Sequence, residues 1–239
     1  MKLFKTLIAS TTLALMAALP AFAQENNTLT DAEKADGWQL LFDGKSMNGW
    51  HRFHQEGVPH GWKIEDDAMV NPHGAGDICT DQKFDWFILE LDYRISADGN
   101  SGIMYHVTDK GNAIWATGPE FQLEDNATAE DPQRCGWLYA LYQPTTDPAT
   151  GKPLDATKPA NQWNHVKIVI SPQKCEHWVN GVKYLEYVIH SPDFNERVEK
   201  SKFGKMQGFA VSDTGYIGFQ GDHPGAVAFR NVKIKPLKQ

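Results

Sequence analysis

The sequence has few cysteines, no cluster of basic residues and no long apolar segment after its first residues. Its 239 residues carry a formal net charge of −7. Nucleic-acid binding would need a basic stripe and is therefore not expected. Anionic membrane surfaces would repel such a chain. No phosphate-binding loop, dinucleotide fingerprint or nucleophile elbow occurs, so these nucleotide-binding and serine-hydrolase classes are not indicated.

The cysteine count limits the covalent and metal chemistry of the chain. Cys79, Cys135 and Cys175 form no Cys-x-x-Cys pair, so a zinc ribbon is not expected. An odd number in an exported chain leaves at least one thiol unpaired. One disulfide remains possible, and the sequence does not choose its partners.

The N-terminus has the pattern of a secretory signal peptide. Lys2 and Lys5 precede an apolar stretch at residues 7–19, and Ala-Phe-Ala at residues 21–23 offers a cleavage site before Gln24. The stretch is too short to span a bilayer, and no later segment is long and apolar enough. We therefore expect residues 1–23 to be removed, residues 24–239 to form a single catalytic domain, and the product to be periplasmic or secreted without a membrane anchor.

Strand periodicity dominates the remaining chain. In residues 87–95, five apolar side chains alternate with Ile88, Glu90, Asp92 and Arg94. Similar patterns predict strands near residues 38–42, 103–106, 120–124, 165–170, 175–179, 216–220 and 227–237. Helix signals are limited to residues 28–36 and to the segment that begins at Ser191-Pro192. About a dozen strands with few helices predict an all-β fold of two antiparallel sheets packed face to face.

Two local signals refine this prediction. Asn180-Gly181 is a strong hairpin signal, and a change of phase near Asn231 predicts a bulge. Residues 125–159, rich in Pro, Thr, Asp and Gly, are too long for a plain connection and should form an ordered functional loop over one face.

Polar side chains on one face of several strands are the main indication of function. Glu120, Gln122 and Glu124 share a face because the strand period is two, as do Glu90, Asp92 and Arg94. His177 and Gln220 add an imidazole and an amide on their own strands. If these faces meet, they form a groove that can bind sugar hydroxyl groups. The alternative is a solvated outer sheet face, which antiparallel sandwiches commonly have.

Further candidates lie in turns and among the aromatic residues. Asn100 precedes Ser101-Gly102 at the start of a strand, where it could bind a sugar hydroxyl or simply serve a turn. Tyr139 and Trp178 could pack against the C–H face of a sugar, although aromatic rings often fill β cores. His223 could add an imidazole at a strand end.

Metal binding has weaker support. His51, His54, His60 and His73 crowd the N-terminal quarter, but their spacing matches no zinc template. We therefore expect no cofactor and leave a divalent cation open.

Several motifs occur in the order of a known family. They are the segments at residues 40–45, 48–50, 62–66, 99–103, 118–122, 163–164, 176–181, 217–220 and 229–232. Together they resemble the 3-keto-disaccharide hydrolase family, which includes enzymes that cleave 3-keto-glycosides. The resemblance covers about residues 36–237 and departs from the expected pattern at Leu123-Glu124-Asp125. It implies a concanavalin A-like jelly-roll sandwich.

The resemblance also implies a reaction. A ketone at sugar C3 acidifies the C2 hydrogen, so a base can remove it and the C1 substituent can leave by elimination, with water then adding. This chemistry needs a base, an acid and donors for the enolate. Glu120 and His177 are the expected acid–base pair in either order. Arg94, Asn100 and Gln220 are the expected donors, with Gln122, Tyr139, Trp178 and His223 in the binding surface.

Two other functions stay open at this point. A carbohydrate-binding module would use the same groove without turnover. An ordinary glycosidase needs two carboxylates about 5 to 9 Å apart. Glu120 and Glu124 are four residues apart on one strand, about 13 Å at the usual rise, which is too far.

Overall fold

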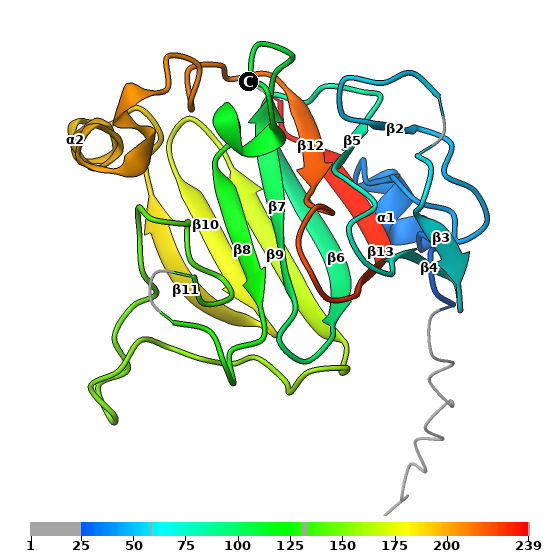
Figure 1. The fold of residues 1–239 in the computed structure, drawn as a ribbon, viewed down its shortest axis with the longest axis horizontal. Helices are drawn as coiled ribbons and strands as arrows, with labels where there is room; N and C mark the ends of the chain where they lie inside the picture. The colour runs from blue at the N-terminus through cyan, green and yellow to red at the C-terminus, as the bar shows by residue number, and fades with distance from the viewer. Residues whose placement is uncertain (1–24, 58, 131–132, 239) are drawn as a thin grey trace, which may run out of the picture.

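The computed structural model describes residues 25–57, 59–130 and 133–238. The predicted signal peptide at residues 1–23 lies outside the described residues. Two antiparallel sheets account for most of the regular structure in this part of the chain (Figure 1).

The larger sheet has eight strands among the described residues. Its order is β11 (Val182–Tyr187), β10 (Cys175–Val179), β9 (Asn164–Ile170), β6 (Phe87–Ile95), β13 (Val227–Pro236), β4 (Ala68–Asn71) and β3 (Lys63–Glu65), with β1 (Gln39–Leu40) paired to β13. The smaller sheet has five strands in the same part of the chain. Its order is β2 (Trp50–Arg52), β5 (Ile78–Thr80), β12 (Tyr216–Phe219), β7 (Asn100–Val107) and β8 (Glu120–Glu124).

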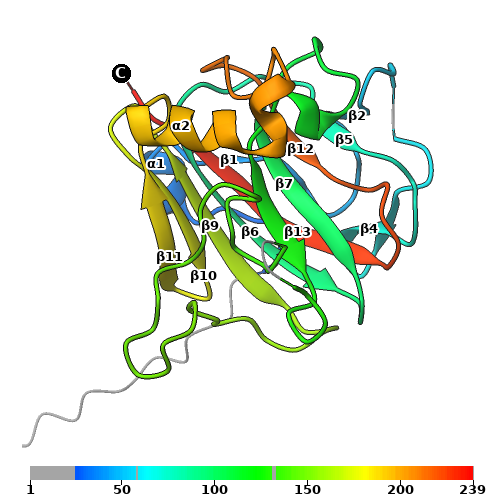
Figure 2. The ribbon, with the colours of Figure 1, turned by 60° about the vertical axis from the view of Figure 1, so that its left-hand side comes forward.

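The two sheets pack face to face (Figure 2), and buried apolar side chains fill the space between them. The strict alternation of β6 explains the packing, because its odd-numbered residues are buried and its even-numbered residues are partly exposed. On the smaller sheet, Phe121 and Leu123 of β8 supply the matching inner face. The prediction of an all-β jelly-roll sandwich of two antiparallel sheets is confirmed.

Short helices lie at the ends of the sandwich. Thr30 caps the N-terminus of α1 (Asp31–Ala35), and Ser191, whose hydroxyl group accepts from the Phe194 N–H, caps that of α2 (Pro192–Lys200). Two 3₁₀ turns, η1 (Ile114–Ala116) and η2 (Lys202–Lys205), border the smaller sheet. No helix in the described ranges is long and apolar enough to cross a membrane.

The predicted turn and bulge are both present. Asn180 and Gly181 join β10 to β11 with φ angles of 48° and 81°, as a tight hairpin requires. The pairing of β13 with β6 shifts register between Arg230 and Lys233, and Asn231 lies there with a φ of 54°. Both sequence signals therefore reported local backbone geometry correctly.

Candidate active site

A cavity of about 340 Å³ opens on the outer face of the smaller sheet. Its walls come from β7, β8, the end of β12, both 3₁₀ turns and the loop that follows β8. The lining residues are Asn100, Trp115, Glu120, Gln122, Gln133, Tyr139, Lys202, Gln220, Asp222 and His223. The volume suits a small polar molecule rather than a polymer segment.

The alternation of β8 places its polar side chains in this cavity. Phe121 and Leu123 are fully buried in the core, so Glu120 and Gln122 face outward. β8 pairs with β7 so that Gln122 lies opposite Gly102. A Cβ atom at Gly102 would collide with the Glu120 carboxyl group, so this glycine provides the space in which the carboxyl group lies.

Glu120 is the most perturbed acid of the cavity. Its side chain is 6% exposed, and burial raises its pKa from 4.5 to about 8. The positive charge of Lys202 opposes this rise, whereas Asp77, Asp222 and Glu124 add to it. At pH 7 the group therefore carries a proton in most molecules, and it becomes a strong base when it ionises.

Three amides, those of Asn100, Gln122 and Gln220, line the same cavity as this carboxyl group. Gln122 Nε2 donates to Asn100 Oδ1 at 3.3 Å and to Glu124 Oε2 at 3.2 Å. The backbone of Gln220 is fixed to β7, since its N–H donates to Gly102 and its C=O accepts from the Ser101 hydroxyl group. Gln220 Oε1 is buried and has no hydrogen-bond partner among the described residues. A buried amide oxygen without a donor is suited to a ligand hydroxyl group.

The rim of the cavity carries residues that the sequence did not indicate. Lys202 opens η2, and its ammonium nitrogen lies 4.1 Å from the centroid of the Tyr139 ring. Trp115 of η1 and Gln133 complete the wall. None of these three belongs to an alternating strand pattern, which is why periodicity could not single them out.

A half-buried acid, Asp77, lies close to the cavity without lining it. Asp77 Oδ1 accepts from the Gly221 N–H at 3.0 Å, next to the lining residues Gln220 and Asp222. Burial raises the pKa of Asp77 to about 6, and the charge of Arg52 opposes this rise. This end of the cavity is therefore acidic.

The structure contradicts the role expected of His177. Its imidazole is fully buried between the sheets, 4.6 Å from the Phe121 ring centroid and edge-on to Tyr105 and Tyr187. Nδ1 donates to the Gly136 carbonyl oxygen at 3.1 Å, and burial lowers the pKa to about 3. His177 cannot reach the cavity, because it shares the inner face of β10 with Cys175 and Val179.

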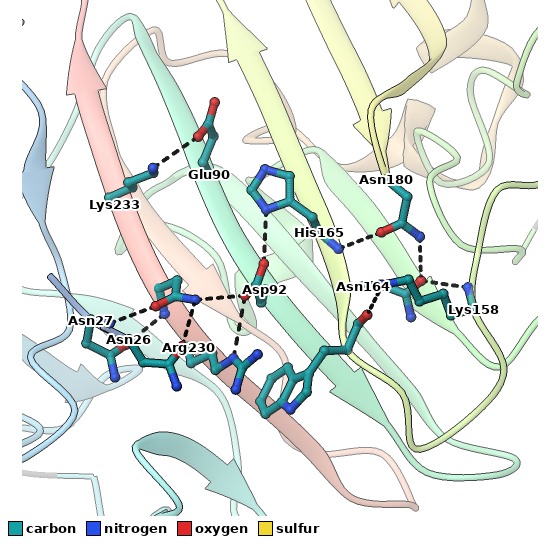
Figure 3. A network of polar contacts seen from close by, with 12 residues as sticks. Asn26, Asn27, Glu90, Asp92, Lys158, Asn164, His165, Asn180, Arg230 and Lys233 are labelled. Carbon is teal, nitrogen blue, oxygen red and sulfur yellow. Dashed lines mark hydrogen bonds and ion pairs between the residues drawn. The ribbon is translucent and has the colours of Figure 1, made fainter. Parts of the chain in front are cut away.

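Arg94 and Trp178 also lie away from the cavity. Both face outward from the larger sheet: Arg94 lies 4.8 Å from the Trp163 ring centroid, and Trp178 lies near Lys167. Figure 3 shows this outer face, where Asp92 contacts His165 at 3.0 Å and Glu90 contacts Lys233 at 3.4 Å. Ion pairs hold Asp92 and Glu90 on this face, and neither Arg94 nor Trp178 is among the described residues that line the cavity of the smaller sheet.

The remaining candidates do converge. Asn100, Glu120, Gln122, Tyr139, Gln220 and His223 all line the cavity. The loop predicted at residues 125–159 contributes Gln133 and Tyr139, and residues 131–132 within it lie outside the described part.

Neither a metal site nor a disulfide is formed by the described side chains. No three His, Cys, Asp or Glu residues in these ranges are grouped as a metal would require. Cys79, Cys135 and Cys175 are all buried free thiols, so the disulfide left open by the sequence is not present.

An all-β sandwich with a sugar-sized polar cavity around a buried acid is the arrangement of a glycoside-cleaving enzyme. The chain belongs to the family of the 3-keto-alpha-glucoside-1,2-lyase-like domain, whose model matches residues 37–235. A 3-keto-disaccharide hydrolase from Bacteroides thetaiotaomicron is 32% identical over 244 residues, which cover 90% of this chain and 83% of that protein. The predicted family membership is thereby confirmed.

Solved structures agree with this assignment. A protein from Parabacteroides distasonis ATCC 8503, assigned as a glycosyl hydrolase, has a TM-score of 0.81 and 35% identity, covering 90% of this chain and 100% of its own. A second structure from the same organism, with the same assignment, has a TM-score of 0.64 and 25% identity, covering 84% of this chain and 99% of its own. The described fold is thus shared by close and more distant relatives.

Proposed function

We propose that this protein cleaves 3-keto-glycosides by elimination at C1 followed by addition of water. The observation that carries the proposal is the Glu120 carboxyl group, buried in a sugar-sized cavity with a pKa raised to about 8. The family and the 3-keto-disaccharide hydrolase relative support the choice of substrate.

Removal of the C2 proton requires a base stronger than an ordinary carboxylate. A ketone at C3 makes the C2 hydrogen acidic, because the negative charge left at C2 spreads onto the C3 oxygen. Ionised Glu120 takes this proton, and its raised pKa makes it a better base than a solvated glutamate. The enolate then re-forms the C3 carbonyl group, a double bond forms between C1 and C2, and the C1–O bond breaks.

The same carboxyl group can complete the cycle. Once protonated, Glu120 can donate to the departing oxygen, and it can later accept a proton from the water that adds at C1. This removes the need for His177, which the sequence had suggested as the second acid–base group. His223, at the cavity rim, is an alternative donor to the leaving oxygen.

The amides and rings of the cavity would hold the sugar. Asn100, Gln122 and the unpartnered Gln220 Oε1 can bind hydroxyl groups. The Tyr139 ring offers an apolar face for sugar C–H groups.

The test compares an oxidised sugar with its unoxidised form. Purified protein is incubated with 3-keto-trehalose or a 3-keto-glucoside in D₂O, beside the parent sugar. We expect cleavage of the keto sugar only, with deuterium incorporated at C2. Binding without turnover would instead favour a carbohydrate-binding module, and cleavage of the parent sugar at the same rate would contradict elimination.

We further propose that the protein is exported to the periplasm or secreted, on the strength of residues 1–23. Cell fractionation and N-terminal sequencing of the mature protein test this. A mature chain that begins at Gln24 outside the cytoplasm is expected, and an intact N-terminus in the cytoplasm would refute it.

A further inference from the structure

We propose that Lys202 is a further catalytic residue, whose ammonium group binds the C3 oxygen of the substrate and stabilises the enolate. The inference rests on the proposed function and extends it to a residue on a different segment. Three features of the structure support it: the rigidity of the segment, the position of the ammonium group and the charge of the cavity.

The backbone at Lys202 is firmly positioned. Lys202 is the first residue of η2, where the Ser201 hydroxyl group accepts from the Phe203 N–H at 3.1 Å. Phe203 is buried and stacks on Phe209, with ring centroids 3.9 Å apart and an interplanar angle of 4°. The turn is therefore anchored on both sides, so the lysine starts from a fixed point at the cavity rim.

Lys202 and Glu120 line the same cavity, and the charge of Lys202 acts on the Glu120 carboxyl group. The ammonium nitrogen of Lys202 lies 4.1 Å from the Tyr139 ring centroid, a cation–π contact. The Tyr139 backbone N–H donates to the Glu120 backbone carbonyl oxygen at 3.0 Å. Tyr139 thus connects the cation to the strand that carries the acid, and a ring contact leaves the ammonium hydrogens available to a ligand.

The charge balance of the cavity favours this role. Lys202 is the sole Lys or Arg among the described lining residues, and no ion pair joins it to a described carboxylate. Lys83, Lys174 and Lys233, in contrast, each contact an acid. A cation beside a neutral Glu120 can stabilise the negative charge that develops on the substrate.

The step balances without any further reactant. Ionised Glu120 takes the C2 proton, and the C–H electron pair forms the C2–C3 double bond while the C3 oxygen becomes negative. Lys202 donates a hydrogen bond to this oxygen and keeps its proton. When the carbonyl group re-forms, electrons move to the C1–C2 bond and expel the leaving group.

The experiment isolates enolate formation from bond cleavage. The probe is a 3-keto-1,5-anhydrohexitol, which has no leaving group at C1, and the readout is exchange of its C2 hydrogen in D₂O followed by NMR. The variants are Lys202→Met, Lys202→Arg and the control Lys205→Met, which alters the exposed lysine at the other end of η2. Cleavage of a 3-keto-glucoside is measured in parallel over a range of pH.

We expect Lys202→Met to slow both exchange and cleavage about 10²- to 10³-fold, as loss of one oxyanion donor does. The loss should fall on kcat more than on KM, and Lys202→Arg should recover part of the rate. The rising limb of the pH profile should move to higher pH in Lys202→Met, because Lys202 lowers the pKa of Glu120 against the effects of burial, Asp77, Asp222 and Glu124. Lys205→Met should behave as wild type.

Two results would separate the possible failures. If wild type neither exchanges nor cleaves the keto sugars, the proposed function itself is wrong. If wild type does both and Lys202→Met matches it in rate and pH profile, the function stands and the role of Lys202 is overturned.

Discussion

Replacing Glu120 by glutamine should abolish most of the activity and at the same time stabilise the protein near neutral pH. The native carboxyl group has a pKa of about 8, against 4.5 for the unperturbed group. The folded state therefore holds the proton more tightly than the unfolded chain does. Below pH 4.5 both states are protonated and the carboxyl group does not lower the stability of the fold. As the pH rises from 4.5 toward 8, the unfolded chain releases the proton more readily than the folded protein, so the free energy of unfolding falls.

The size of the effect follows from these two pKa values. The ionisable group costs about 3 kcal/mol of stability at pH 7 and about 1 kcal/mol at pH 5. Glutamine has nearly the same shape and cannot ionise, and no described residue forms a hydrogen bond or ion pair with the Glu120 carboxyl group that would be lost. Glu120→Gln should therefore be more stable than wild type by up to these amounts.

The assay is urea unfolding of wild type and Glu120→Gln at pH 5 and pH 7, with the exposed Glu56→Gln as control. The difference between variant and wild type should shrink by about 2 kcal/mol from pH 7 to pH 5. The control should show no such dependence. A stability difference that is the same at both pH values would refute the protonated, buried acid and with it the basis of the mechanism.

Three further predictions concern the surrounding structure. Gly102→Ala should fold but lose at least about tenfold in kcat/KM, because its methyl group displaces the Glu120 carboxyl group; circular dichroism and kinetics check this. Burial lowers the pKa of His177 from 6.5 to about 3, so the free energy of unfolding of wild type should fall by about 2 kcal/mol between pH 8 and pH 5 because of this residue. In urea unfolding, His177→Phe should not show this part of the pH dependence. Unchanged pH dependence in His177→Phe would contradict the buried neutral imidazole. Arg94→Ala and Trp178→Ala should retain wild-type kcat/KM, because both side chains face away from the cavity; a tenfold loss in either would place part of the site on the larger sheet.

Much of the fold could be predicted because β-strand periodicity is local. The alternation in residues 87–95 and 120–124 identified which side chains share a face, and the structure has strands at those positions. The family motifs then supplied the sandwich, which periodicity by itself cannot distinguish from other two-sheet arrangements.

The site was predictable only in part, because alternation does not say which face is buried or to which sheet a strand belongs. Glu120 and Gln122 were found since their strand neighbours Phe121 and Leu123 are apolar. His177 was misplaced, although its face also carries Cys175 and Val179, which already indicated the core. The position of Lys202 in the cavity wall depends on a 3₁₀ turn and on a tertiary contact with Tyr139, and neither produces a periodic pattern in the sequence.

The division between the strand that holds the acid and the turns that surround it bears on how such an enzyme can diversify. Glu120 belongs to a strand of the smaller sheet and Lys202 to η2, whereas Trp115 belongs to the short turn η1. Mutations or small insertions in η1 could reshape the entrance while Glu120 and Lys202 keep their environment. Directed evolution toward new substrates should therefore begin with η1 and leave β8 and Lys202 untouched.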